Sequence, residues 1–346
     1  MPLKDQYRDW RVPVAYLKLF LQYAESEGLS AERLLAGTRL QAARLRLSDE
    51  PVDFGDTRRV LANVTRAMGP GWHLSLAQRL SIPSHGPLGF AVVTAPDVRA
   101  AVSVLLRFIG TRGAWVWLAG SEEDDEFVIR LYESLDMGDE RQALVELALL
   151  AIQNMLERPL GREIRGARIA FAYAEPGYRE QLAKSFHARL EFNGGGYLLS
   201  FPAAWLDEPC ILHDAAMHRY LLSRCEEDLR AAAGILPAEV AVRQALLART
   251  DHMPSLGEIA AAQHVSARTL IRRLKLGGTS YKGILEDVRR TLAADYLLNS
   301  EMSVASIAFR LAYHDPSNFG RAFRSWFGIS PGQYRAHVRT FREKSI

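Results

Sequence analysis

Apolar residues recur at intervals of three and four through much of the chain, and this spacing predicts amphipathic helices. In the first two thirds of the chain, short apolar runs typical of strands alternate with the helical stripes. Helices are expected at 14–24, 31–35, 98–108 and 144–156, and strands at 115–118, 127–132, 167–173 and 196–201. The last third shows helical patterns. The fold class is therefore predicted to be an α+β domain followed by an all-α domain.

Two of the expected strands, 115–118 and 127–132, flank the segment from Gly120 to Asp125, in which four of the six residues are acidic. Two strands joined by turn-forming residues favour a β-hairpin. We expect the six residues to form its turn, with an acidic tip in solvent.

The all-α part begins with two short helices, each preceded by a capping residue. Ser255 and Glu258 have the spacing of a capping box, and Ser266 can cap the helix that follows a break at 263–265. On this second helix one side is apolar and the other carries cations. The cations that share a side are Arg268, Arg272 and Lys275.

The same pattern returns after a long amphipathic stretch at 281–299. A short helix at 303–311 is followed by Asp315 and Pro316, a capping carboxylate before a proline at the first helical position. The helix that starts there has an aromatic side, and the side opposite carries Ser317, Arg321 and Arg324. A last helix is expected from Ser330, with Tyr334 and Arg335 on it.

Two units of short helix, tight turn and cationic helix are two helix-turn-helix modules in tandem. The connecting stretch 281–299 has 19 residues, which rise about 28 Å as an α-helix. This is near the roughly 34 Å between major-groove segments one turn apart on one face of B-DNA. One chain can therefore place two recognition helices in successive major grooves.

The charge is divided unequally between the two parts. Before Ile235 there are 27 Lys and Arg and 31 Asp and Glu, a net charge of −4. From Ile235 on there are 16 Lys and Arg and 9 Asp and Glu, a net charge of +7. The two parts add up to the net charge of +3. A basic domain is typical of nucleic-acid binding, although charge alone fits a solvated basic face equally well.

Length and composition restrict the class of protein further. A chain of 346 residues is long enough for two or three domains with cores of their own. Two cysteines cannot form a disulfide framework, so we expect a reducing, cytoplasmic location. No apolar run approaches the roughly 18 residues of a membrane span. The polar residues 1–11 do not resemble a secretory signal.

From about residue 240 to 340 the sequence resembles the AraC/XylS family of bacterial transcription regulators. The resemblance covers about a third of the chain and includes both helix-turn-helix units. It is carried by LxxIA from Leu256, SARTLIRRL from Ser266, GTSY from Gly278, VRR from Val288, SIA from Ser306, DPSNFGRAFRSWFGISP from Asp315 and YR from Tyr334.

The resemblance implies which residues face DNA. The base-reading positions are Arg268, Thr269 and Arg272 in the first unit and Ser317, Asn318 and Arg321 in the second. Arginine pairs with guanine, and asparagine with adenine. Four further cations would hold phosphates, which position the protein without reading sequence: Arg273, Lys275, Lys282 and Arg324. The alternative for each residue is a solvated surface side chain.

Both tight turns depart from the family pattern. Where the family usually has glycine, the matching positions hold His264 and Ala312. Either the turns have another shape, or each unit carries about 1 kcal/mol of backbone strain.

The N-terminal part resembles the effector domain of one AraC-family subgroup, often labelled arabinose-binding-like and found in ornithine-utilisation and virulence regulators. The supporting stretches are GPLGFA from Gly86, APDVRAA from Ala95 and LVELA from Leu144. Aromatic residues of the expected strands are candidates to line an effector pocket, although strand aromatics are more often core residues. These candidates are Trp115, Trp117, Tyr132 and Tyr173.

No set of residues predicts catalysis or metal binding. His213 and His218 are five residues apart, which does not place both on one helix face, and no partner completes a zinc set. Cys210 and Cys225 are interpreted as packing residues. The run 193–196 lacks the lysine and the serine or threonine of a phosphate-binding loop, so a turn is expected there.

We therefore predict a cytoplasmic transcription regulator without enzymatic activity or cofactor. Its α+β effector and dimerisation domain would span 1–230, a linker and leading helix 231–250, and the tandem helix-turn-helix DNA-binding domain 251–346. The expected partners are promoter DNA, a small-molecule effector, RNA polymerase and a second copy of the chain, with no membrane. Two alternatives stay open: an enzyme, such as an alkyl-acceptor repair activity, fused to a DNA-binding module, and a regulator whose first domain only dimerises.

Overall fold

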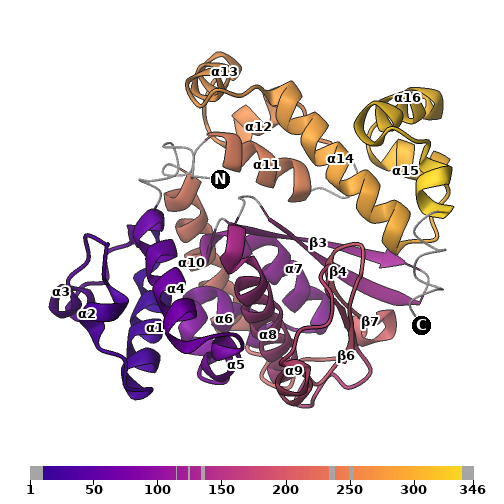
Figure 1. Cartoon of the computed structure of the whole chain (residues 1–346). Helices are drawn as coiled ribbons and strands as arrows, with labels where there is room; N and C mark the ends of the chain where they lie inside the picture. Colours follow the sequence, from indigo (N-terminus) through magenta and orange to yellow (C-terminus); the bar gives the residue numbers. More distant parts are fainter. Residues whose placement is uncertain are drawn as a thin grey trace.

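The computed structural model describes residues 11–113, 115–123, 125–133, 137–233, 238–248 and 253–336. Figure 1 shows two parts, a lower body in which helices surround one sheet and an upper layer of helices from the C-terminal third of the chain. The upper layer lies against one side of the sheet (Figure 1). The predicted fold class, α+β followed by all-α, is confirmed.

The sheet of the lower body has five strands in the order β3-β4-β7-β5-β6. All neighbouring strands are antiparallel except β5 and β6, which run parallel. The strands are β3 (Val116–Glu123), β4 (Glu126–Glu133), β5 (Arg168–Ala170), β6 (Arg189–Glu191) and β7 (Tyr197–Pro202). A separate ribbon pairs β1 (Arg11–Val12) with β2 (Val52–Asp53).

Ten helices of the described chain belong to the lower body. They are α1 (Val14–Ser26), α2 (Ala31–Leu34), α3 (Ala42–Leu47), α4 (Phe54–Met68), α5 (Trp72–Ala77), α6 (Gly86–Val93), α7 (Val98–Phe108), α8 (Arg141–Leu160), α9 (Arg179–Ser185) and α10 (Ala215–Ala233). Short 3-10 segments are η2 (Ile82–His85), η3 (Ile109–Thr111), η4 (Gly138–Glu140) and η5 (Ala203–Asp207). Helix α8 is buried along most of its length, because apolar residues surround it on most sides, and it packs against α5, α6 and α7.

The upper layer contains both helix-turn-helix units. Its helices are α11 (Ala238–Ala248), α12 (Leu256–Ala262), α13 (Ala267–Leu276), α14 (Tyr281–Asn299), α15 (Val304–Arg310) and α16 (Pro316–Phe327), and residues 331–336 are also helical. Helices α12 and α13 form the first unit, α15 and α16 form the second, and α14 connects them (Figure 1). Leu270, Leu274, Phe319 and Phe323 lie in the hydrophobic core of this layer.

The helix starts form as the sequence predicts. Ser255 accepts a hydrogen bond from the Glu258 N–H, while the Glu258 carboxylate accepts one from the Ser255 N–H. Ser266 accepts from the N–H at the third helical position of α13, and Asp315 accepts from the second of α16. Each cap satisfies backbone donors that have no partner within the helix.

The turn expected at 120–125 is wrong in extent. Strand β3 continues through Gly120 to Glu123, and Glu123 lies opposite Glu126 across the hairpin. The segment does not lie wholly in solvent, because the Glu123 carboxylate accepts hydrogen bonds from Arg130 at 2.7 and 2.8 Å. A buried cation on the neighbouring strand thus allows an acidic residue to belong to the sheet.

Both tight turns adopt the conformation of glycine without having glycine. The backbone φ is +54° at His264 and +58° at Ala312. The turns therefore keep the shape that usually requires glycine, and each carries backbone strain. In the second unit, Arg289 of α14 donates to the carbonyl oxygens of Leu311 and Ala312, at 2.8 and 3.1 Å. These two bonds hold the turn in a conformation that an L-residue disfavours.

The boundary between the two parts falls in or near the expected linker, 231–250. Within it, α10 ends at Ala233 and α11 begins at Ala238, while 234–237 and 249–250 lie outside the described residues. None of the helices in the described ranges combines the length and the apolar character needed to cross a membrane.

Replacing Ala312 by glycine should raise the free energy of unfolding by about 1 kcal/mol, because glycine adopts a positive φ without a steric penalty. The control is Ala305→Gly at an exposed position of α15, where glycine should lower the free energy of unfolding by about 1 kcal/mol. Urea denaturation measures both. Equal destabilisation by the two substitutions would show that Ala312 carries no strain.

Candidate functional site

The outer surface of α13 carries most of the DNA-contacting residues predicted for the first unit. Leu270 and Leu274 are buried on its inner side. Four of the predicted cations on this helix are exposed, Arg268, Arg272, Arg273 and Lys275, and Lys282 is exposed near the start of α14. Thr269 is partly exposed, and its hydroxyl is hydrogen-bonded to the capping hydroxyl of Ser266 at 2.9 Å.

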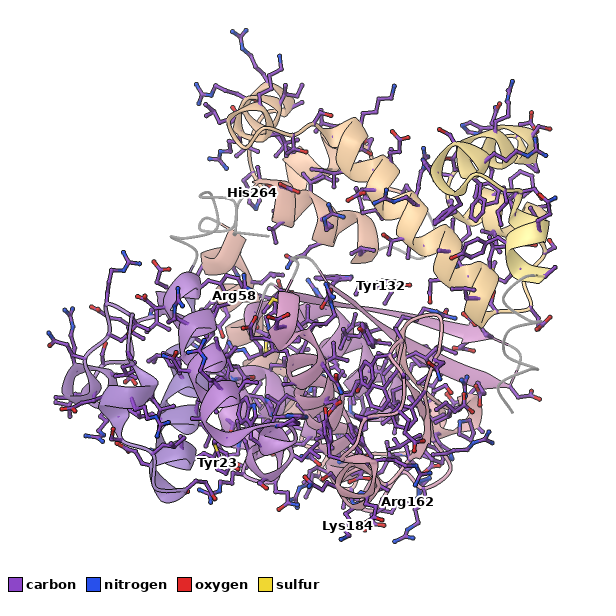
Figure 2. The ribbon with its side chains drawn as sticks, in the orientation of Figure 1. Tyr23, Arg58, Tyr132, Arg162, Lys184 and His264 are labelled. Atoms are coloured by element: carbon purple, nitrogen blue, oxygen red, sulfur yellow. The ribbon has the colours of Figure 1, made fainter. Side chains whose placement is uncertain are left out.

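Helix α16 repeats this arrangement in the second unit. Phe319 and Phe323 are fully buried beneath it. The predicted DNA-contacting residues on its outer side are all exposed: Ser317, Asn318, Arg321 and Arg324. The Asn318 amide oxygen accepts a hydrogen bond from Arg321, which aligns these two side chains. Figure 2 shows nitrogen-tipped side chains that project from α13 and α16 away from the lower body.

Among the described residues, six cations of this surface differ from many arginines of the lower body in forming no ion pair with a carboxylate. In the lower body Arg99, Arg112 and Arg162 pair with acidic side chains at 2.6, 2.9 and 2.6 Å. Within the described part of the chain, no ion pair engages the side chains of Arg268, Arg272, Arg273, Lys275, Lys282 and Arg324. An uncompensated positive surface attracts a polyanion, and two such helices at the ends of α14 suit DNA.

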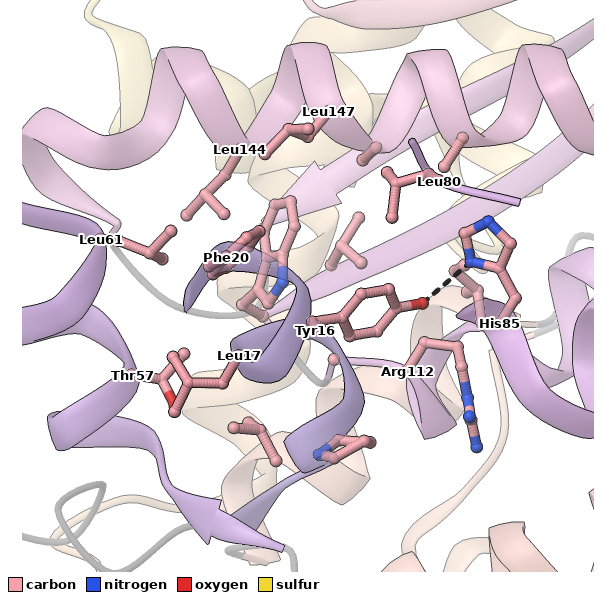
Figure 3. A pocket seen from close by; sticks show the side chains of 18 of the residues that line it. Tyr16, Leu17, Phe20, Thr57, Leu61, Leu80, His85, Arg112, Leu144 and Leu147 are labelled. Carbon is pink, nitrogen blue, oxygen red and sulfur yellow. Dashed lines mark hydrogen bonds between the residues drawn. The ribbon is translucent and has the colours of Figure 1, made fainter. Parts of the chain in front are cut away.

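A cavity of about 120 Å³ lies inside the lower body. Helices α1, α4 and α8 form its walls together with the start of β3 (Figure 3). Its lining is almost entirely aliphatic and aromatic, and the apolar side chains around it include Leu17, Phe20, Leu61, Leu144 and Leu147. Such a space, partly open to the surface, lined by apolar side chains and provided with a few polar groups, is typical of a small-molecule site.

Three polar side chains from distant parts of the sequence line one end of the cavity: Tyr16, His85 and Arg112, whose guanidinium points away from the other two (Figure 3). The Tyr16 hydroxyl is hydrogen-bonded to Nδ1 of His85 at 3.0 Å. Burial raises the pKa of Tyr16 to about 12. Burial, and secondly the charge of Arg112, lowers the pKa of His85 to about 4. At neutral pH both side chains are therefore uncharged.

Of the four aromatics predicted to line an effector pocket, the structure brings only Trp115 to this cavity. Trp117 and Tyr132 lie on the opposite face of the sheet, within the core of the upper layer. Tyr173 donates a hydrogen bond to the buried carboxylate of Glu146. Burial, followed by the charge of Glu146, raises the pKa of Tyr173.

Sequence reasoning missed the polar end of the cavity. Tyr16, His85 and Arg112 come from α1, η2 and the end of η3, and no spacing links positions so far apart. The one local feature near these residues is Gly86, which directly follows His85. Its φ is +57°, a backbone conformation that favours glycine.

Strand β3 separates the cavity from the DNA-binding layer. Val116 and Leu118 line the cavity, whereas Trp117 and Ala119, which alternate with them, pack in the core shared with α11. Helix α11 packs directly on β3. The cavity and the DNA-binding layer therefore lie on the two faces of one strand.

A buried ion pair attaches α14 to the sheet. Arg130 Nε of β4 lies 2.7 Å from Oδ2 of Asp295, and the two side chains are 3% and 8% exposed. The same carboxylate oxygen accepts a hydrogen bond from the Tyr132 hydroxyl at 2.7 Å. Although burial opposes the charge, the carboxylates of Asp295 and Glu123 raise the pKa of Arg130. The Arg130 guanidinium also lies 5.6 Å from the ring centre of Tyr296.

Sequence reasoning missed this pair as well, although a signal was present. Arg130 stands inside the apolar run 127–132, and a charge at the centre of such a strand requires a buried partner. The identity of the partner, 165 positions further along, has no local signature.

The two parts pack closely, but some buried hydrogen-bond donors at their contact have no partner among the described residues. Gly195 lies so near α14 that an added β-carbon would be 2.4 Å from Cβ of Leu298. Arg130 Nε faces Asp295 as an ion pair without the geometry of a hydrogen bond. Three further buried donors at this contact have no protein partner in the described ranges: Trp117 Nε1, Gln244 Nε2 and Arg310 Nε. Each buried donor without a partner opposes the docked arrangement by about 1–3 kcal/mol.

The cysteines and histidines weighed for catalysis have structural environments. Cys210 and Cys225 are buried, and burial raises the pKa of each thiol to about 11. His213 and His218 are each hydrogen-bonded to a different backbone carbonyl oxygen, at 3.0 and 2.9 Å. Among the residues that the structure describes, no three His, Cys, Asp or Glu side chains are placed to hold a metal ion.

A tandem helix-turn-helix layer with an uncompensated cationic surface, docked on an α+β domain, defines a DNA-binding regulator. Comparison with known families agrees. The model for the N-terminal arabinose-binding domain of AraC transcription regulators matches residues 28–210, and a helix-turn-helix domain model matches residues 259–337. The chain belongs to the AraC family of transcription regulators.

Individual relatives are regulators too. The ornithine utilization regulator of Pseudomonas aeruginosa is 30% identical over 329 residues, which cover 94% of this chain and 96% of that protein. An HTH-type transcriptional regulator of Mycobacterium tuberculosis is 25% identical over 332 residues, with the same coverage of 94% and 96%. The crystal structure of the transcriptional regulator CdpR from Pseudomonas aeruginosa aligns with 93% of this chain and 98% of its own, at 20% identity and a TM-score of 0.46.

Replacing Asp295 by asparagine should lower the free energy of unfolding by about 3 kcal/mol, because Arg130 then keeps a buried charge with one carboxylate fewer. The matched control is Asp287→Asn on the same helix. Asp287 is 40% exposed and pairs with Arg243 and with the exposed Arg290, so its loss should cost less than about 1 kcal/mol. Guanidinium denaturation measures both variants, and equal effects would show that the buried pair contributes nothing special.

The lowered pKa of His85 predicts a dependence of stability on pH. The unfolded chain has the ordinary value of 6.5 and the folded chain a value of about 4, so in between only the unfolded chain binds the proton. Stability should be complete above pH 6.5 and fall by up to about 3 kcal/mol as the pH approaches 4.

His85→Gln removes the titrating group and should flatten this part of the curve of unfolding free energy against pH. His213→Gln, at an exposed position, is the control and should keep the wild-type dependence. The measurement is denaturation at a series of pH values between about 4 and 7. An unchanged slope in the His85 variant would contradict the assignment.

Proposed function

We propose that this AraC-family regulator senses a small molecule in the cavity of its α+β domain and, in response, changes how its two helix-turn-helix units engage promoter DNA. The observation that carries the proposal is the shared strand: inward residues of β3 line the cavity, and outward residues hold α11. A molecule that binds one arrangement of this strand more tightly than another shifts the population of the two arrangements.

The energetics of the contact between the two parts support a reversible change. The buried Arg130–Asp295 pair specifies where α14 docks. The three donors without partners oppose docking. Because these terms oppose each other, a ligand that binds the docked and undocked arrangements with different affinity can shift the balance between them.

For DNA we propose that each unit reads bases in one of two successive major grooves. The base-contacting residues would be Arg268, Thr269, Arg272, Ser317, Asn318 and Arg321. The phosphate-contacting residues would be Arg273, Lys275, Lys282 and Arg324. Their exposure on the outer sides of two helices, and the absence of carboxylate partners for the cations within the described part, support these assignments.

We further propose that residues 1–230 form the sensing and dimerisation domain, 231–250 the linker and leading helix, and 251–346 the DNA-binding domain of a cytoplasmic protein. The active form would be a homodimer that contacts RNA polymerase. Support for dimerisation comes from apolar side chains between 47% and 65% exposed before and within α10: Ile211, Leu212, Met217 and Tyr220. Exposed apolar groups in one region are typical of protein contacts.

We propose no enzymatic activity for this chain. The alkyl-acceptor alternative needs a cysteine that is a thiolate near neutral pH. A pKa of about 11 keeps both Cys210 and Cys225 protonated there. The cavity argues against the alternative in which the first domain only dimerises, because dimerisation does not require a cavity.

The family model is named for arabinose binding, and one relative is named for the regulation of ornithine utilization. The cavity of this chain suits neither. Sugar hydroxyls, or the ammonium groups of ornithine, would face aliphatic side chains, and a polar group buried without a partner costs several kcal/mol at most sites.

DNA binding is tested on a promoter site located by footprinting. Arg272→Ala and Arg321→Ala should each weaken binding to that site by about 1–3 kcal/mol, and weaken binding to a scrambled duplex less, because they remove base contacts. Lys282→Ala should weaken binding to both duplexes equally and reduce the dependence on salt, because it removes a phosphate contact.

Fluorescence anisotropy titrations on both duplexes, at several salt concentrations, measure these effects. Equal losses on the two duplexes for Arg272→Ala would make Arg272 a phosphate contact. The absence of any protected site at moderate salt would contradict the proposed function as a whole.

A further inference from the structure

We propose that the cavity binds a compact monocarboxylate, a molecule with a single carboxylate on a small apolar body. This inference rests on the sensing function proposed above and names the chemical class of its ligand. It follows from the size of the cavity, the character of its walls and the hydrogen-bonding groups at its polar end.

The volume limits the apolar body of the ligand. The cavity measures about 120 Å³, somewhat less than the roughly 150 Å³ of an apolar protein cavity that takes up benzene. The body therefore has about six carbon atoms, in one ring or a short chain. A long acyl chain or a fused ring system exceeds this space.

The walls exclude ligands with several polar groups. Leu61, Leu144 and Leu147 lie around the cavity away from His85 and Arg112 (Figure 3). No Asp or Glu is among the described lining residues, so no side chain there neutralises an ammonium group. A polyhydroxylated molecule would give up hydrogen bonds to water without replacement. Amines, amino acids and sugars are therefore excluded.

The polar end offers hydrogen-bond donors. Arg112 uses Nε and Nη2 in bonds to Thr111 and Asp228, and its Nη1 has no partner among the described residues. When the Tyr16 hydroxyl donates to Nδ1 of His85, the imidazole carries its proton on Nε2. This N–H has no hydrogen-bond partner among the described residues. A carboxylate accepts several N–H bonds at once and pairs well with arginine.

The charge at this end suits one carboxylate and not two. Arg112 is the single cation among the described lining residues, and Asp228 of α10 already lies 2.9 Å from it. One ligand carboxylate completes a group of one guanidinium between two carboxylates, as Arg130 forms with Glu123 and Asp295. A second carboxylate at the apolar end would have no donor.

The test is calorimetric titration of the full chain, without DNA, with hexanoate and phenylacetate as probes. Hexylamine and adipate are matched controls, because they keep the six-carbon chain and change only the charged groups. L-arabinose and L-ornithine complete the set. We expect saturable binding of both monocarboxylates and at least about tenfold weaker binding of the other four compounds. Failure of both monocarboxylates to bind, or equal affinity for hexylamine, would overturn the proposal.

Variants locate the site. Arg112→Gln should weaken hexanoate binding by about tenfold or more, because it removes the charged donor. Asp228→Asn breaks the same ion pair from the other side, leaves the guanidinium in place, and should retain binding. If Asp228→Asn loses binding as Arg112→Gln does, Arg112 acts only through the structure, and the assignment of the carboxylate end is wrong.

A third variant fills the cavity. Ala148 of α8 lines it, so Ala148→Leu should abolish binding of both monocarboxylates while unfolding stays cooperative. Retained binding in this well-folded variant would place the ligand elsewhere and overturn the inference.

Titrations of the footprinted DNA, with and without hexanoate, separate this inference from the sensing function. Saturable hexanoate binding that leaves DNA affinity unchanged supports the ligand class and contradicts the sensing function. If instead an amine, amino acid or sugar changes DNA affinity and Ala148→Leu abolishes that response, sensing in the cavity stands and the proposed ligand class is wrong.

Discussion

The arrangement of this protein depends on a β-hairpin that is buried on both faces. One face of β3 and β4 closes the core of the α+β domain, and the other receives α11 and α14 of the DNA-binding layer. A charge in such a place is costly alone, and breaking a buried pair leaves an uncompensated charge. Arg130 meets this constraint with two carboxylates, Glu123 from its own hairpin and Asp295 from α14. Because α14 connects the two helix-turn-helix units, this contact, together with the packing of α11 on β3, fixes the position of both units relative to the α+β domain.

The same geometry relates the two candidate sites. Alternate side chains of β3 serve different neighbours, with Leu118 toward the cavity and Trp117 toward α11. Because side chains alternate along a strand at a period of two, a shift of the β3 backbone moves residues on both faces. The unpaired donors at the contact oppose the docked arrangement. Under the proposed function, a ligand biases this arrangement only if its affinity differs between the two arrangements.

Local sequence patterns predicted the DNA-binding half closely, and the sensing half less so. The caps at Ser255, Ser266 and Asp315 and the connector 281–299 form as expected, because helices of this kind depend on contacts within a few residues. The strand at 167–173 is confirmed only at Arg168–Ala170, and β3 extends into the expected turn. Sheet boundaries depend on pairing with strands further along the chain, such as β7 beside β5, which periodicity does not detect. Of the four aromatics proposed for the pocket, Trp117 and Tyr132 face the other domain for the same reason: alternation predicts two faces but not which neighbour covers each.

The sequence by itself determined the class of protein, the two helix-turn-helix units and the identity of the outward cations, because a capped amphipathic helix specifies its own inner and outer sides. It also marked the two turns at His264 and Ala312 as unusual, but the positive φ values and the support from Arg289 are properties of the folded chain. Only the tertiary structure decided where a small molecule fits and how the domains meet. Tyr16, His85 and Arg112 form one end of a cavity, and Arg130 meets Asp295, through contacts between segments that are remote in sequence. Such contacts arise from the packing of whole elements, and no local spacing of residues encodes them.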